Sequence, residues 1–165
     1  MSNVNLDRMG AMALALSMTS AFAAPPETAT MQVTASVAAL CRLSLSGNMG
    51  FGALDVTVTS NATQSVTATY QCTKGTPVSS FQVGGITAVA AGGTYSGTMT
   101  GASATPDTIP YAIAWADPGT FTGLGMQAIV ANQKSVTLNG TILNADYVNK
   151  KPDNYNHSVA VTVNY

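Results

Sequence analysis

Apolar and polar residues alternate with a period of two along much of the chain. This pattern is typical of β-strands that bury one face, because successive side chains point to opposite sides of a strand. The strictest run covers residues 29–37, where five apolar side chains alternate with Thr, Gln, Thr and Ser. Further runs lie at 43–45, 56–58, 66–72, 81–83, 111–115, 129–130, 136–140 and 159–165. No clear helical period is present, so the sequence predicts an all-β protein.

Turn-forming residues separate these runs. Gly47, Gly75-Thr76-Pro77 and Asp117-Pro118-Gly119 are examples, and Gly84-Gly85 ends the run at 81–83. The stretch 92–108 is rich in Gly, Ser and Thr, which predicts a long hairpin or loop. Many short strands with regular turns are typical of a β-sandwich, and 165 residues suit one domain.

The chain carries few charges. Six Lys and Arg residues stand against seven Asp and Glu, which gives a formal net charge of −1. A nucleic-acid-binding protein needs a basic face for the phosphates, so this composition argues against nucleic acid as a partner. Disordered chains combine low hydrophobicity with high net charge, which this chain does not have.

The N-terminus predicts export. Residues 9–18 are apolar apart from Ser17, and Ala21-Phe22-Ala23 forms an A-x-A cleavage site. We therefore expect a signal peptide over 1–23 and a mature chain that begins at Ala24. The alternative is a disordered or buried N-terminal helix.

The chain has two cysteines, Cys41 and Cys72. In an exported protein such a pair predicts one disulfide, whereas in a cytosolic protein both would remain reduced. His157 is the single histidine, and no C-x-x-C pair occurs, so we expect no metal and no cofactor. His157 and Ser158 are neighbours whose side chains would face opposite sides of a strand, so we expect no catalytic dyad and no enzyme, and no small-molecule substrate.

Two of the predicted strands, 29–37 and 159–165, lie near the two ends of the mature chain. A sandwich that ends on a strongly alternating strand leaves the far edge of that strand open, with unpaired backbone groups. The segment 29–37 would extend over roughly 30 Å and suits such an edge. Periodicity alone leaves two alternatives: 29–37 is the first strand of its own domain, or it is lent to a neighbouring molecule.

Several short motifs resemble the spore coat U domain group, which includes the pilins of archaic chaperone–usher pili. They are the alternating segment before Cys41, Met49-Gly50-Phe51-Gly52, Cys72-Thr73-Lys74-Gly75, Tyr111-Ala112-Ile113-Ala114-Trp115-Ala116-Asp117, Val136-Thr137-Leu138-Asn139-Gly140 and the run from Tyr155 to Val163. One departure is His157, because the family usually has Asp at this position.

The resemblance implies an incomplete immunoglobulin-like β-sandwich that lacks its last strand and is completed by donor-strand exchange. Residues 24–39 would be the donor segment and 40–165 the pilin-type domain. The implied donor-strand anchors are Ala29, Met31, Val33, Ala35 and Val37, and the implied acceptor-groove residues are Val159, Val161, Val163 and Tyr165. Cys41 and Cys72 match the disulfide pair of the family.

The implied function is that of a structural subunit of a surface pilus that supports attachment and biofilm formation. Its partners would be neighbouring subunits, a periplasmic chaperone and an outer-membrane usher. A structural protein of a spore or cell coat and a minor, tip-proximal adhesive subunit are the alternatives. Tyr111 and Trp115 share one face of a predicted central strand, which favours a place in the core over a sugar-binding surface.

Overall fold

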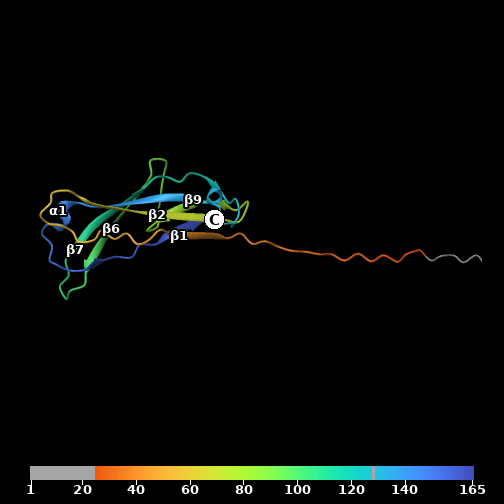
Figure 1. Cartoon of the computed structure of the whole chain (residues 1–165), viewed down its shortest axis with the longest axis horizontal. Helices are drawn as coiled ribbons and strands as arrows, with labels where there is room; N and C mark the ends of the chain where they lie inside the picture. Colours follow the sequence, from red (N-terminus) through yellow and green to blue (C-terminus); the bar gives the residue numbers. More distant parts are fainter. Residues whose placement is uncertain (1–24, 128) are drawn as a thin grey trace, which may run out of the picture. The chain divides into compact units, whose positions relative to one another are not determined.

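The computed structural model describes residues 25–127 and 129–165, and this part of the chain folds as an all-β, immunoglobulin-like sandwich. The predicted signal peptide, 1–23, lies outside the described residues. The chain divides into one unit that ends at Ala35 and a second that runs from Ser36 to Tyr165. The strands below all belong to the second unit (Figure 1).

The larger sheet has six antiparallel strands, of which β7 and β9 are central. Their order across the sheet is β1 (Cys41–Leu45), β2 (Ala62–Cys72), β9 (Lys134–Ile142), β7 (Thr108–Trp115), β6 (Gly93–Gly101) and β10 (Tyr155–Asn156).

A three-stranded sheet contributes to the opposite layer, in the order β11 (Val161–Asn164), β4 (Ser80–Val83) and β5 (Ile86–Thr87). A small two-stranded sheet pairs β3 (Pro77–Val78) with β8 (Phe121–Thr122). The described helical elements are short: a 3₁₀ turn, η1 (Val130–Asn132), and α1 (Asn144–Tyr147).

The core lies on the inner faces of these strands, as the alternation predicts. In β2 every second residue from Val66 to Cys72 is buried. Tyr111 and Trp115 are buried in β7, so the prediction that they belong to the core is confirmed.

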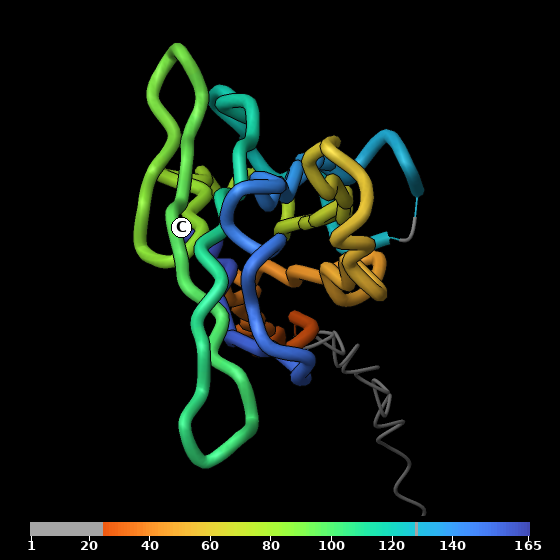
Figure 2. Tube along the Cα trace, turned by 90° about the vertical axis from the view of Figure 1, so that its left-hand side faces the viewer, coloured from red at the N-terminus to blue at the C-terminus, as the bar shows by residue number. Residues whose placement is uncertain are grey.

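Two predicted turns have the expected form. Gly84 and Gly85 both have positive φ and join β4 to β5 as a two-residue hairpin, a conformation that favours glycine. The Gly, Ser and Thr-rich stretch contains all of β6 and the β6–β7 connection, so it is part of a long hairpin (Figure 2).

Two predicted strands are wrong. Residues 56–58 form a turn, because the Asp55 carboxylate accepts hydrogen bonds from the backbone N–H and the hydroxyl of Thr57. Residues 129–130 lead into η1, where Asn132 N–H bonds to Ile129 O and Gln133 N–H to Val130 O. In both places an apolar pair was too short to specify a strand.

The segment 25–40 belongs to no strand in the described chain. Met31, Val33 and Val37 are 82%, 83% and 88% exposed, although their spacing is that of a buried strand face. The structure therefore does not place 29–37 in a sheet as the first strand of its own domain.

Candidate strand-binding groove

Two strand edges are free on the same side of the sandwich. Among the described strands, β11 pairs only with β4, and β1 pairs only with β2. The strands β1 and β11 approach each other but belong to different sheets. Their open edges therefore border a shared space.

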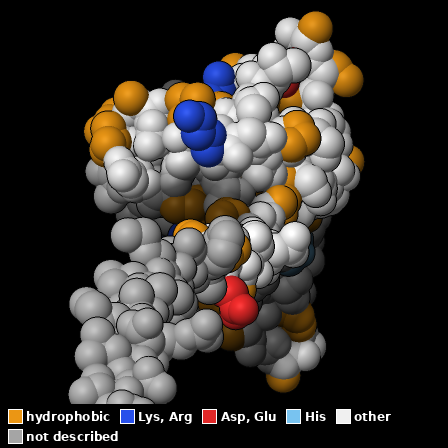
Figure 3. All heavy atoms as spheres, turned by 90° about the vertical axis from the view of Figure 1, so that its right-hand side faces the viewer, with side chains coloured by type: hydrophobic (Ala, Val, Ile, Leu, Met, Phe, Trp, Pro, Cys, Tyr) orange, Lys and Arg blue, Asp and Glu red, His pale blue; other side chains and the backbone are white. Residues whose placement is uncertain are grey.

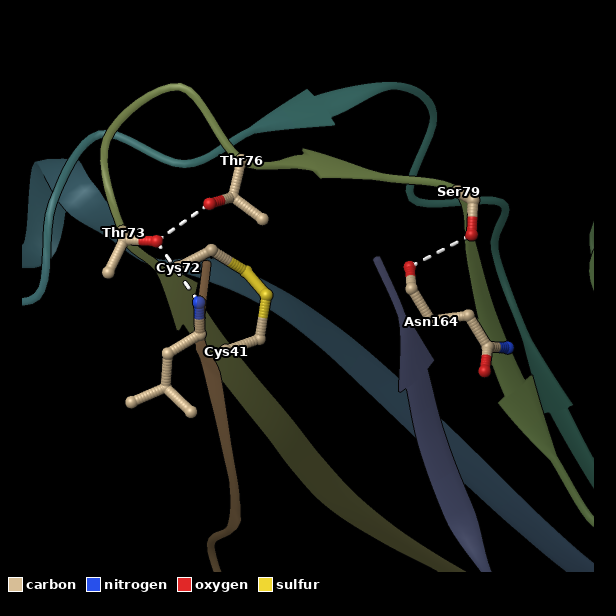
Figure 4. Close-up of a disulfide and its surroundings, with 7 residues drawn as sticks. Cys41, Cys72, Thr73, Thr76, Ser79 and Asn164 are labelled. Atoms are coloured by element: carbon tan, nitrogen blue, oxygen red, sulfur yellow. Dashed lines mark hydrogen bonds between the residues drawn. A yellow bond between two sulfur atoms is a disulfide. The ribbon is translucent and has the colours of Figure 1, made fainter. Parts of the chain in front are cut away.

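The backbone of β11 directs hydrogen-bonding groups into that space. The carbonyls of Ala160 and Asn164 accept hydrogen bonds from Gly84 and Ser79 N–H, each at 2.8 Å, and the Ser79 hydroxyl also bonds to Asn164 O at 3.1 Å (Figure 4). Backbone groups alternate in direction along a strand. The N–H and C=O groups of Val161 and Val163 must then point to the edge away from β4.

The same argument applies to β1. Thr73 N–H bonds to Leu40 O at 2.9 Å and Ser46 N–H bonds to Thr67 O at 2.8 Å. The alternate residues of β1, beginning with Cys41, therefore turn their backbone groups outward.

The predicted disulfide is present, and it anchors the start of β1. Cys41 and Cys72 lie opposite each other in the β1–β2 ladder and are bonded to each other. Next to this bond the Thr73 hydroxyl accepts a hydrogen bond from Leu40 N–H at 3.1 Å and contacts the Thr76 hydroxyl at 2.6 Å (Figure 4). The disulfide therefore holds the edge strand β1 against β2.

An open cavity of about 460 Å³ lies beside these edges. It is lined by Leu45 from β1, by inward-facing residues of β2, β4, β6, β7 and β9, by the β1–β2 connection, and by the chain from Tyr155 to Val161. Of the predicted acceptor residues, Val159 and Val161 line this cavity. Val163 packs against the core outside the lining, and Tyr165 is 53% exposed and does not line it.

A second cavity of about 810 Å³ continues toward α1. The two cavities share Met49, Phe51, Met99 and Tyr155, so we call them together the groove. Sequence reasoning did not anticipate this second part. The available signal was Gly140, a glycine at an inward-facing position of a strand, which often marks a close approach of other atoms.

A polar pair spans the groove wall. The Tyr111 hydroxyl lies 2.8 Å from Nδ1 of His157, and both residues line the 460 Å³ cavity. Burial, with a contribution from Tyr95, raises the pKa of Tyr111 to about 12. Tyr111 therefore keeps its proton at neutral pH. The sequence did not reveal this contact, which joins residues 46 positions apart.

The model of one protein family, described as the Spore Coat Protein U domain, matches residues 27–162. The chain belongs to the spore coat protein U domain family. This is a family of structural, pilin-like surface or coat domains rather than of enzymes. No curated protein and no solved structure gives a match.

The match to the spore coat protein U domain includes both 29–37 and the groove, since it runs from Glu27 to Thr162 in β11. The segment is thus part of the family domain, not an unrelated extension.

The chemistry of the groove suits a polypeptide. No Asp, Glu, Lys or Arg lines the 460 Å³ cavity, whereas Lys150, Lys151 and Asp153 line the 810 Å³ cavity beside its apolar residues. The face in Figure 3 carries scattered exposed hydrophobic side chains and few charged ones. Within residues 25–127 and 129–165 no cluster of three potential metal ligands occurs. No helix in the described chain is long and apolar enough to cross a bilayer. The groove can take apolar side chains and hydrogen-bond a main chain.

Proposed function

We propose that this chain is an exported structural subunit that polymerises by donor-strand exchange into a surface pilus. In this proposal the segment 29–37 of one copy enters the groove of the next. The observation that carries it is the combination of two free strand edges beside a cavity without charged lining residues and an alternating segment that belongs to no described strand.

The added strand would be held in two ways. Its backbone would pair with the outward groups of Val161 and Val163, which extends the sheet of β11. Its apolar face, which includes Met31 and Val33, would fill the groove. Main-chain bonds of this kind give affinity, and pockets for alternate side chains give specificity.

The positions of the strand ends favour one direction for the added strand. The start of β1 and the end of β11 lie near the same end of the sandwich, the disulfide end (Figure 4). Only residues 38–40 connect 29–37 to β1, and they reach about 10 Å. A donor parallel to β11 would therefore bring the body of the donor subunit to the disulfide end of the acceptor.

The donor segment of the acceptor is itself joined to the start of β1 at that end, so the two would compete for the same end. A donor antiparallel to β11 instead places the neighbouring body near α1, at the opposite end of β9. Each subunit then uses one end to give a strand and the other to receive the neighbour. Such a head-to-tail contact does not close on itself and produces a filament.

Before assembly the groove needs a temporary cover, since an exposed apolar edge strand promotes aggregation. We propose that a periplasmic chaperone lends this strand and that an outer-membrane usher exchanges it for the segment 29–37 of the next subunit. The resulting pilus would support attachment and biofilm formation. The family description also supports a coat protein assembled through the same groove. Electron microscopy of the cell surface separates fibres from a continuous coat.

The experiment compares two charges placed one residue apart. Val33→Asp puts a carboxylate on the apolar face of the donor segment, whereas Thr34→Asp puts it on the polar face. We expect Val33→Asp to abolish the detergent-resistant ladders of the mature protein, because an unpaired buried charge is costly. Thr34→Asp should retain them. Normal ladders from Val33→Asp would refute the donor assignment.

A further inference from the structure

Four side chains line both parts of the groove: Met49, Phe51, Met99 and Tyr155. Met49 and Phe51 come from the connection between β1 and β2, and both line the 460 Å³ cavity as well as the 810 Å³ cavity. Both pack against the buried core. The groove therefore has two compartments, with these four side chains at their boundary. We call Met49 and Phe51, the two that come from this connection, the constriction.

Gly140 is the base of this constriction. It lies on the inner face of β9 between the buried residues Leu138 and Ile142. A β-carbon at Gly140 would overlap Met49 Sδ and lie 2.8 Å from Phe51 Cζ. The missing side chain lets Met49 and Phe51 sit directly on the sheet.

The neighbours of Gly140 mark the two compartments. Leu138 lines the 460 Å³ cavity, and Ile142 lines the 810 Å³ cavity near α1. Inward-facing residues of a strand are about 7 Å apart. Successive anchors of an added strand have the same spacing, so each can face one of these positions.

The apolar face of the donor segment consists of Ala29, Met31, Val33, Ala35 and Val37. Ala35 is the one small residue between two larger ones. Val33, Ala35 and Val37 are large, small and large in turn. This order matches that of the first compartment, the constriction and the second compartment.

We infer that Ala35 of one copy lies opposite Met49 and Phe51 of the next and fixes the register of the donor strand. The inference rests on the proposed donor-strand exchange and on its direction antiparallel to β11. Val33 then enters the compartment at Leu138, and Val37 enters the compartment at Ile142. A slip of two residues would press Val33 or Val37 onto the constriction, and a slip of one would turn the polar face inward.

The test first enlarges Ala35 in the donor segment and then makes room for it by shortening Met49 or Phe51 in the groove. The mature full chain is refolded from denaturant, and polymer formation is followed by light scattering and detergent-resistant ladders. Ala35→Leu should slow polymer formation roughly tenfold or more, because it overpacks the constriction. Ala104→Leu is the matched control, since it makes the same change at an exposed position of the β6–β7 connection that lines neither cavity, and it should stay within about twofold of the unmodified chain.

The second step tests whether a smaller groove residue restores polymer formation in the Ala35→Leu chain. Adding Met49→Ala to Ala35→Leu should restore polymer formation to within about threefold of Met49→Ala alone. If Met49→Ala folds poorly, Phe51→Leu removes the ring atom nearest Gly140 and replaces it in the same comparison.

Equal rates for Ala35→Leu and Ala104→Leu would overturn the register, whatever the relief variants do. Failure of rescue in a relief variant that itself polymerises normally would also overturn it. These results differ from failure of the proposed function, in which Val33→Asp would polymerise like the unmodified chain.

Discussion

The Tyr111 hydroxyl lies 2.8 Å from His157 Nδ1 and joins the buried face of β7 to the connection between β10 and β11. This connection passes from the six-stranded sheet to the three-stranded sheet. The contact therefore helps to position β11, whose free edge borders the groove.

Tyr111→Phe tests the burial of the Tyr111 hydroxyl through the pH dependence of stability, and the contact with His157 through stability at pH 7. Burial raises the pKa of Tyr111 from 10.0 to about 12, so the folded protein keeps a proton that the unfolded chain loses above pH 10. This contribution to stability is complete below pH 10 and is lost as pH rises from 10 to 12. We expect Tyr111→Phe to reduce the alkaline loss of stability in urea unfolding, and to cost about 1 kcal/mol at pH 7 through the lost hydrogen bond.

His157→Ala is the control for that experiment. It removes the hydrogen bond but leaves Tyr111 buried, and burial is the main cause of the raised pKa. The alkaline loss should therefore persist in His157→Ala. An identical alkaline profile in Tyr111→Phe and the unmodified chain would contradict the assignment.

The disulfide should contribute strongly to stability. Cys41 and Cys72 are 31 residues apart, and closing such a loop stabilises a fold by roughly 3–4 kcal/mol in the chain-entropy model. We expect reductant to lower the free energy of unfolding by about this amount. The double variant Cys41→Ala, Cys72→Ala should be equally destabilised and insensitive to reductant. Equal stability of the unmodified chain with and without reductant would exclude this role.

The role of β11 as the acceptor edge can be tested by substituting two neighbouring residues, Val161 and Thr162. Val161 lines the groove, whereas Thr162 is exposed on the opposite face of β11. We expect Val161→Asp to prevent a chain from receiving a donor strand, because the charge would be buried. Thr162→Asp should polymerise normally. Sedimentation of the refolded proteins measures this difference, and equal polymer from both variants would argue against the groove as acceptor.

Much of the sandwich could be predicted from the sequence because one face of its strands is buried. The runs in β2, β7 and β9 alternate over several residues, and their apolar positions are the core positions of the structure. The strand predictions at 56–58 and 129–130 were wrong because local turns, such as the Asp55 turn, compete with strand formation over so few residues.

The candidate site could be predicted only in part. The resemblance to the spore coat U domain group implied Val159 and Val161 as acceptor residues, and both line the groove. Tyr165 does not, because the groove extends from Val161 toward α1 and not toward the disulfide end. The Met49–Phe51 constriction depends on contacts between distant segments, which strand periodicity does not encode.

Periodicity also does not indicate which molecule completes a sheet. The run at 29–37 has the same pattern as an internal strand, although it belongs to no strand in the described chain. A strand that pairs with its own domain and one that pairs with a neighbour need the same apolar face. The choice between them depends on the free edges of β1 and β11.

The central claim is that the leading segment of one copy fills the groove of another. The most direct measurement mixes two defective chains and determines the mass of the product by native mass spectrometry. A chain without residues 24–37 can accept a strand but not give one, and a Val161→Asp chain can give a strand but not accept one. Our account predicts that each chain alone stays monomeric and that the mixture forms a one-to-one dimer. A mixture that stays monomeric, or polymer formed by the chain without residues 24–37, would contradict it.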